Sequence, residues 1–505
     1  MELVTLLLIL LSVCCSVWIY QKWRDISSKP LPPGPRGLGT FFNFVNAVSN
    51  FTLHAHADRW ARQYGDIVSV ALFGQNIIIL NEGRLMKRFF CDDSLKMVTN
   101  DRPSSFASRF VFKDQCIGVS SLGKHHTRMR KLFHGSLKLY GDGVQCFEDT
   151  IIEELKRVVL EINSNAEVPL DEIISNFLLN VIHILLTDER PNDGGSTLRQ
   201  MKEYNSAVNR LFGLEVDQPL TVMPFLRHLP GPLKTKCDNV KSCIEALYAS
   251  IYENMKAQYI PGEPRGLIQA ALETQHNMSD KSKMADDHIR FIMLEIISAG
   301  YLTTRGTLLG LFLALMEQPD LQDTLYEHIK ASVGDRKVNV EDRGSIPYVD
   351  AMVLEVLRYL THGPVSLPHR TNKDIEIDSY RIPKDSIILT NFWSMAHNEK
   401  VWGSPWVFRP ERFLDDQGQL LPPDHPVRQR FLPFGVGKRQ CPGEVFAKTR
   451  MFLLITTLCQ HFKFLPPEGG MTSSSDVRTW SPGLILQPEK VLCKVELRDT
   501  RPLLR

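Results

Sequence analysis

The chain has 505 residues, of which 43% are hydrophobic and 23% charged, which is typical of a folded globular protein and excludes an intrinsically disordered one. Its 59 Lys and Arg residues nearly balance 57 Asp and Glu residues, and the resulting net charge of +2 argues against a general nucleic-acid-binding protein. Ten cysteines, none of them in Cys-x-x-Cys spacing, are too few for a disulfide scaffold and argue against a structural zinc site.

The N-terminal segment is predicted to be a membrane anchor. Residues 3–20 are uncharged and largely apolar, and as a helix they would span about 27 Å, close to the roughly 30 Å of a bilayer's hydrocarbon core. Tyr20 and Trp23 stand where aromatic belts occur, and Lys22 and Arg24 place positive charge on the following side. We therefore expect residues 1–24 to cross a membrane once, with the rest of the chain in the cytoplasm.

A cleaved signal peptide is the alternative for this segment. Signal peptides have a positive first region, a shorter apolar core and small residues before the cleavage site, whereas this chain begins with an acid and ends its apolar run with bulky residues. The anchor is therefore favoured. The proline-rich residues 25–39 that follow predict a stiff, non-helical hinge, and residues 40–505 form the expected globular domain.

This body is predicted to be mainly α-helical with a minor β part. Amphipathic or long apolar stretches predict helices over residues 145–163, 285–316, 349–361 and 443–462. Short β-branched runs predict a hairpin from residues 67–73 and 77–81, and a later group of strands at residues 375–377, 380–382 and 387–390. Because strands and helices do not alternate regularly, a doubly wound α/β fold is disfavoured.

One loop, residues 431–444, carries the most specific chemistry. It reads Phe-Leu-Pro-Phe-Gly-Val-Gly-Lys-Arg-Gln-Cys-Pro-Gly-Glu, with glycines where tight turns are needed. Cys441 follows a basic pair and is expected to open a helix, so charge and helix dipole both favour its thiolate. A thiolate held in this way suits a single bond to a metal. The alternative, a small buried hydrophobe, fits Cys459 better than Cys441.

The spacing Phe-x-x-Gly-x-Arg-x-Cys-x-Gly resembles the haem-binding signature of the cytochrome P450 family. The resemblance implies a cytochrome P450-like fold, haem b as cofactor, and Cys441 as the axial ligand of the haem iron. It also implies that Phe434 and Arg439 contact the haem. The expected activity is that of a monooxygenase, which inserts one oxygen atom from dioxygen into its substrate.

Two further segments resemble motifs of the same family. Glu355 and Arg358 are one helical turn apart, where they can pair, and they resemble the family's Glu-x-x-Arg motif. The segment around Arg412 resembles the one that supplies a second arginine. By similarity, these three residues would form a buried ion network that supports folding and haem retention. In isolation, a surface ion pair is the alternative.

Haem propionates require cations, and several residues match their positions in the family. Arg439 stands two residues before the cysteine, and His369 lies in a segment where microsomal members place a propionate-binding histidine. Arg130 matches the arginine of a Trp-x-x-x-Arg motif, in which His126 replaces the tryptophan. Arg102 matches a further propionate arginine. For each cation taken alone, a solvated surface charge is the alternative.

In the helix predicted over residues 285–316, residues 297–304 resemble the family's oxygen-activation segment. Gly300 would let the helix open beside the haem, and Thr303 aligns with the threonine that relays protons. Leu302 occupies the position of the usual acid and cannot carry a proton. The alternative for Thr303 is a hydroxyl bonded back to its own helix.

These features leave three functions open. The retained Thr303 favours a monooxygenase over an isomerase or dehydratase that rearranges peroxides without external oxygen. A non-catalytic haem-binding protein for sensing or storage is the third.

The overall pattern resembles the microsomal branch that contains drug-metabolising and steroid-hydroxylating members. It implies an apolar substrate, such as a steroid, fatty acid, other lipid or xenobiotic, and electrons from NADPH–cytochrome P450 reductase, with cytochrome b5 as a second donor. By similarity, the substrate pocket would draw on residues 104–122, 212–214, 296–300, 365–367 and 482–486. A basic face for the acidic redox partner would comprise Arg128, Arg130, Lys131, Lys138 and Lys438.

Overall fold

The structure is a computed structural model of the whole chain. It describes residues 29–37, 47, 52–72, 75–137, 147–163, 167–278 and 284–498. The predicted membrane anchor at residues 1–24 and the first part of the hinge lie outside the described residues.

Three small sheets make up the β part. The strands are β1 (Ile67–Leu72), β2 (Gln75–Leu80), β3 (Val168–Pro169), β4 (His369–Arg370), β5 (Ile375–Ile377), β6 (Tyr380–Ile382), β7 (Ile387–Thr390), β8 (Phe462–Leu465) and β9 (Leu492–Leu497). The largest sheet has the order β1-β2-β7-β4, and the others are β3-β9-β8 and β5-β6. In the predicted hairpin, Ile67 pairs with Leu80 and Val70 with Ile77 in antiparallel register. The parallel pair β2–β7 then joins this hairpin to the later strands, over 300 residues away in sequence.

Most of the remaining described chain is helical, which confirms the predicted mainly helical fold with a minor β part. The helices are α3 (Leu53–Tyr64), α4 (Gly83–Cys91), α5 (Phe106–Phe112), α6 (Lys124–Leu137), α7 (Glu148–Asn163), α8 (Leu170–Thr187), α9 (Ser196–Leu211), α10 (Leu214–Val222), α11 (Pro232–Leu247), α12 (Asn254–Ala257), α13 (Gly266–His276), α14 (Asp286–Glu317), α15 (Pro319–Val333), α16 (Pro347–Leu360), α17 (Phe392–His397), α18 (Glu399–Trp402), α19 (Pro426–Arg430) and α20 (Glu444–His461). Proline at the first position starts α15 and α16 without losing a helical hydrogen bond.

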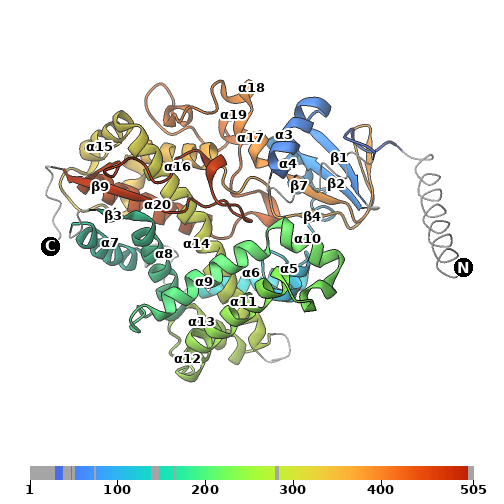
Figure 1. Cartoon of the computed structure of the whole chain (residues 1–505), viewed down its shortest axis with the longest axis horizontal. Helices are drawn as coiled ribbons and strands as arrows, with labels where there is room; N and C mark the ends of the chain where they lie inside the picture. Colours follow the sequence, from blue (N-terminus) through green and yellow to red (C-terminus); the bar gives the residue numbers. More distant parts are fainter. Residues whose placement is uncertain are drawn as a thin grey trace, which may run out of the picture.

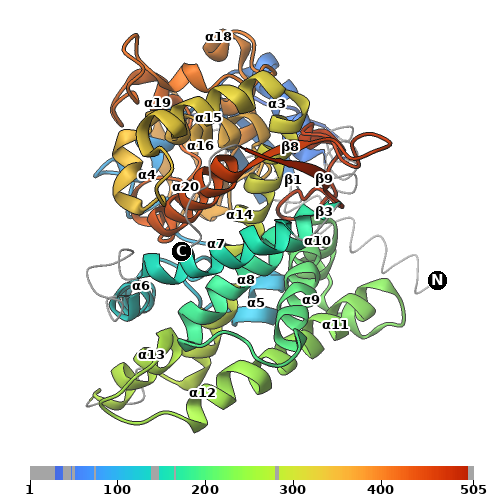
Figure 2. The same ribbon diagram turned by 90° about the vertical axis from the view of Figure 1, so that its left-hand side faces the viewer.

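Helix α14 forms the axis of the helical part. In Figures 1 and 2, α8, α9 and α11–α13 gather on one side of α14, whereas α15, α16 and α20 lie on the other. The β1-β2-β7-β4 sheet stands at one end with α3 and α4. Residues on every side of α14 are buried over much of its length, as expected for a helix that is apolar all round.

Two helices among the described residues, α8 and α14, are long and apolar enough to cross a bilayer. Both are mostly buried within the fold, so their apolar character is explained by core packing.

The described part of the hinge, residues 29–37, is non-helical and docks on the sheets. The Pro33 carbonyl accepts the Ser69 backbone N–H at 2.9 Å, and the Pro30 carbonyl accepts that of Arg381 at 2.9 Å. The Arg36 guanidinium donates to the Ser69 carbonyl at 2.7 Å. These contacts fix the direction in which the chain leaves the body, because the stiff segment is tied to β1 and β6.

Candidate active site

A large cavity lies between α14 and the cysteine loop. Its volume is about 1290 Å³, which exceeds the usual range for a small-molecule site of roughly 300–1,000 Å³ and leaves room for more than one ligand. Each of the five predicted pocket regions contributes to its wall. The wall also includes Ile182 and Leu185 of α8, together with Glu295 and His362, which the sequence analysis did not identify.

The cysteine loop presents Cys441 to this cavity. The Cys441 backbone N–H donates to the Phe434 carbonyl at 2.8 Å, which closes the loop, and both residues line the cavity. Gly437 has φ of +66°, and a Cβ there would lie 2.7 Å from the Phe90 carbonyl oxygen of α4. Only glycine therefore allows the loop to approach α4 this closely.

Helix α20 begins at Glu444, three residues after the cysteine, so the prediction that Cys441 opens the helix is wrong by about one turn. Burial raises the pKa of the Cys441 thiol, and the Gly443 N–H opposes this only in part. The charge of Arg130 also favours the thiolate, but burial outweighs it. A bond to a metal cation would supply the missing stabilisation.

The buried Arg102 and the half-buried Arg439 reach the same cavity. Arg439 donates to the carbonyls of Asn100 at 2.8 Å and Ser120 at 2.6 Å, and Arg102 donates to that of Gly118 at 2.9 Å. Among the described residues, neither arginine takes part in an ion pair. Burial lowers the pKa of Arg439 to about 10 and that of Arg102 to about 9.

His126 and Arg130 of α6 stand beside these arginines and line the cavity. Arg130 donates to the Lys438 carbonyl at 2.9 Å, which ties α6 to the cysteine loop. The His126 Nε2 atom is buried without a hydrogen-bond partner. Burial, and then the charges of Arg439, Arg130 and Arg102, lower the pKa of His126 to about 3.

His369 of β4 also lines the cavity. Its ring stacks on Phe90 with centroids 4.0 Å apart, and its Nδ1 atom lies 3.2 Å from the Thr99 carbonyl oxygen. Burial and the nearby arginines lower the pKa of His369 well below its ordinary value.

The residues present fit a haem. Buried arginines without acid partners are costly, and here they share one cavity with an unpartnered His126 nitrogen and a cysteine. Two propionates would offset the arginine charges, and the Cys441 sulfur would hold the iron.

Gly300, Leu302 and Thr303 form the cavity wall on α14. The Thr303 hydroxyl donates to the Ala299 carbonyl at 2.7 Å, so the back-bonding that we considered as the alternative is present. This bond leaves the hydroxyl oxygen free to accept a hydrogen bond from a donor in the cavity.

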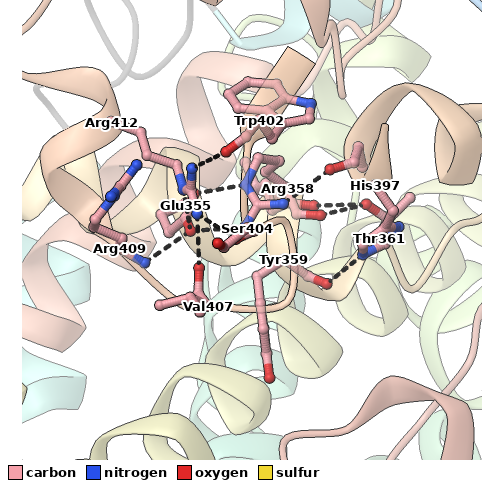
Figure 3. A network of polar contacts seen from close by, with 12 residues as sticks. Glu355, Arg358, Tyr359, Thr361, His397, Trp402, Ser404, Val407, Arg409 and Arg412 are labelled. Atoms are coloured by element: carbon pink, nitrogen blue, oxygen red, sulfur yellow. Dashed lines mark hydrogen bonds and ion pairs between the residues drawn. The ribbon is translucent and has the colours of Figure 1, made fainter. Parts of the chain in front are cut away.

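The structure brings Glu355, Arg358 and Arg412 together, as Figure 3 shows. Arg358 donates to both Glu355 carboxylate oxygens at 2.7 Å, and the two side chains have no exposed surface. The Arg412 Nε atom lies 3.4 Å from Glu355. The Arg409 backbone N–H adds a further bond to the carboxylate at 2.8 Å.

Glu295 of α14 is a wall residue that sequence reasoning missed. Its carboxylate accepts the backbone N–H groups of Ile117 at 2.9 Å and Gly118 at 2.5 Å, which anchors that loop to the helix. Burial raises the pKa of Glu295. The available signal was a single acid within an otherwise apolar helical stretch.

The chain is similar to known proteins over most of its length. The family model described as "Cytochrome P450" matches residues 32–495. Cytochrome P450 2U1 from Homo sapiens is 31% identical over 85% of this chain and 78% of its own length, and the Mus musculus protein of that name is 29% identical over 96% and 93%. Steroid 17-alpha-hydroxylase/17,20 lyase from Ictalurus punctatus is 27% identical over 92% of this chain and 91% of its own.

A solved structure, described as zebra fish cytochrome P450 with abiraterone, has the same fold. Its TM-score is 0.73 at 24% identity, over 88% of this chain and 99% of the other. The family match covers nearly all the described residues, including the cysteine loop and α14. The chain therefore belongs to the cytochrome P450 family of haem-containing monooxygenases.

Proposed function

We propose that Cys441 is the axial ligand of haem b and that Arg102, His126, Arg130, His369 and Arg439 hold the propionates. The observation that carries this proposal is one cavity that joins the cysteine, the unpaired arginines and the Thr303 turn of α14. Phe434 would pack against the porphyrin from the cysteine loop. When bound, the haem supplies reductive activation of dioxygen and transfer of one oxygen atom.

On the side of the cavity formed by α14, the protein's own residues hold and move protons. Thr303 would accept a hydrogen bond from cavity water while its own O–H donates to the Ala299 carbonyl, and Gly300 leaves room beside it. Leu302 is 9% exposed and cannot carry a proton, so water in the cavity would deliver it.

The substrate would be an apolar molecule such as a steroid, fatty acid, other lipid or xenobiotic. Support comes from the apolar residues of the cavity wall, which include Phe112, Ile182, Phe212, Val365 and Leu484. Such a wall binds through burial of apolar surface, which selects size and hydrophobicity more than a particular functional group.

The test of the ligand is Cys441→His, compared with Cys459→Ser on the far part of α20. We expect the reduced carbon-monoxide spectrum typical of thiolate ligation in the wild type and in Cys459→Ser, and its loss in Cys441→His. Retention of the thiolate-type spectrum by Cys441→His would reject the assignment.

An isomerase or dehydratase acting on peroxides is the second candidate, favoured by Leu302 at the proton-relay turn. The co-reactants that turnover requires distinguish the monooxygenase from the isomerase or dehydratase. A monooxygenase needs NADPH, the reductase and dioxygen, whereas the isomerase converts a fatty-acid hydroperoxide anaerobically without NADPH. We expect the first result.

We also propose a single-pass anchor at residues 1–24, a hinge at residues 25–39 and a cytoplasmic catalytic domain at residues 40–505, on the endoplasmic reticulum. Exposed apolar side chains support a membrane-facing surface; they are Val222, Met223, Phe225 and Leu229. Removal of residues 1–24 should release the protein from microsomes in alkaline carbonate, and its retention there would contradict the anchor.

Electrons would come from NADPH–cytochrome P450 reductase, with cytochrome b5 as a second donor. The exposed Lys131 and Lys438 support a basic docking face, and Lys138 of that predicted face lies outside the described residues. Lys131→Glu with Lys438→Glu should slow reduction by the reductase more at low salt than at high salt. If the double variant and the wild type were reduced at the same rate at each salt concentration, this docking face would be contradicted.

A further inference from the structure

Three carbonyl groups in one turn of α14 accept hydrogen bonds from side chains of other elements. His362, which follows α16, has its Nε2 atom 3.0 Å from the Thr303 carbonyl oxygen. The Gln487 Nε2 atom, in the chain before β9, donates to the Leu302 carbonyl at 2.8 Å. Arg450 of α20 donates to the Gly300 carbonyl at 3.1 Å.

The tautomer of His362 follows from its hydrogen-bond partner. A carbonyl oxygen only accepts, so the imidazole must carry its proton on Nε2. The ring can come this close because residue 306 is glycine, where a Cβ would lie 3.0 Å from the ring. Burial lowers the pKa of His362 to about 4, so the ring stays neutral and its single N–H, on Nε2, donates to the Thr303 carbonyl of α14.

The orientation of Gln487 is also determined. Its Oε1 atom accepts the Arg305 guanidinium at 2.9 Å, and Arg305 itself is held by Ser175 of α8 at 3.0 Å. The amide nitrogen therefore has to face α14 and the Leu302 carbonyl.

Arg450 is the least expected of the three donors. It is 1% exposed, and no ion pair involves it in the part of the chain that the structure describes. Its guanidinium lies 4.2 Å from the centre of the Phe446 ring and also reaches the Thr304 hydroxyl at 3.3 Å. A buried cation that is bound only by neutral groups is costly, which implies a role for its contact with α14.

We propose that His362, Gln487 and Arg450 form a carbonyl clamp that holds the turn of α14 at residues 300–303 and thereby positions the Thr303 hydroxyl for proton delivery. A helix carbonyl has two lone pairs. A second donor from outside shares the oxygen with the helical N–H and tilts the carbonyl outward. The three clamp residues are positioning residues, and this inference rests on the proposed role of Thr303.

The test uses the full-length haem-loaded protein with its reductase. His362→Phe and Gln487→Glu each remove one donor, and the glutamate keeps the acceptor for Arg305. His362→Gln restores a donor near the original position, and Arg450→Lys keeps the charge in its place. His461→Phe is the matched control, since this histidine also contacts a backbone carbonyl of α20 but lies outside the cavity wall. Haem content and the reduced carbon-monoxide spectrum establish that each variant is folded.

Two measurements are compared. The first is the hydrogen-deuterium exchange of residues 304, 306 and 307, whose amides follow the carbonyls of residues 300, 302 and 303 by one helical turn. The second is the hydrogen peroxide released per NADPH oxidised, with dodecanoic acid and with progesterone as probe substrates. Loss of one hydrogen bond should change either quantity roughly three- to tenfold. We expect increases in His362→Phe and Gln487→Glu, and values near wild type in His362→Gln and His461→Phe.

The clamp is overturned if His362→Phe and Gln487→Glu match His461→Phe in both measurements. It is also overturned if His362→Gln behaves like His362→Phe, because the donor would then not be the cause. Thr303→Ala distinguishes the two proposals. If it leaves the peroxide yield unchanged, the role of Thr303 fails, while the exchange of residues 304, 306 and 307 still tests the clamp by itself.

Discussion

The buried charges of one ion network are compensated by a partner one helical turn away and by a second partner from a distant segment. Glu355 and Arg358 have no exposed side-chain surface, and the charge of each is compensated by the other and by Arg412. A buried pair of this kind contributes little net stability, but removal of one partner leaves an unpaired charge in the core.

Glu355→Ala should therefore destabilise the protein by about 3–5 kcal/mol. Lys241→Ala removes one partner of an exposed pair with Glu245 at 3.7 Å and should cost under about 1 kcal/mol. Urea unfolding followed by tryptophan fluorescence measures both. Equal midpoints for the two variants would contradict a structural role for the network.

The arginines of the cavity present the opposite case, because their charges have no acid partner among the described residues. Arg439→Leu should lower the haem-to-protein ratio after purification, and Arg439→Lys should lower it less because the charge remains. Arg84→Leu, at an exposed ion pair with Glu82, should leave the ratio unchanged. Full haem content in Arg439→Leu would contradict the proposal that Arg439 holds a propionate.

At the scale of elements, the site depends on how closely α14 packs against its neighbours. Gly310 lies where α14 meets α16. A Cβ at this position would overlap Leu360 and lie 2.8 Å from Trp480. This contact sets the spacing between the helix that carries Thr303 and the helix that carries Glu355.

Gly310→Ala should consequently destabilise the protein by about 1–3 kcal/mol through overpacking. Gly135→Ala is the matched control, since Gly135 is also helical and a Cβ there would meet nothing within 4 Å. In that exposed position alanine should stabilise by up to about 1 kcal/mol. Thermal unfolding of the two variants should shift in opposite directions, and a shift of both in the same direction would argue against close packing at Gly310.

For the whole molecule, several histidines are packed in their neutral form. Burial lowers the pKa of His54, His362 and His397 to about 4. Between that value and their ordinary pKa of about 6.5, the unfolded chain binds more protons than the folded chain, so stability falls as the pH drops through this range.

At about pH 5.5, each of these histidines should reduce the free energy of unfolding by about 1.4 kcal/mol relative to neutral pH. Urea unfolding at both pH values measures the difference. His397→Gln should decrease this difference in the free energy of unfolding by the contribution of one histidine. His328→Gln, at an exposed position, should leave the difference unchanged. A difference that is unaffected by His397→Gln would assign the acid sensitivity to other groups.

The sequence by itself determined those features that depend on neighbouring residues. The cysteine loop is one continuous stretch, so its glycines, Arg439 and Cys441 can be recognised in the sequence by their fixed spacing. The hairpin of β1 and β2 and the long apolar helix α14 follow from local periodicity and β-branched content. The pairing of Glu355 with Arg358 also lies within one helical turn.

Only the tertiary structure decided which distant residues meet. Arg102, Arg130 and Arg439 come from three separate segments, and the anchoring role of Glu295 depends on a loop almost 180 residues earlier. The contacts of His362, Gln487 and Arg450 with α14 have no signature in the sequence. The physical reason is that local propensities act over a few residues, whereas such contacts are selected by the packing of the whole chain around α14.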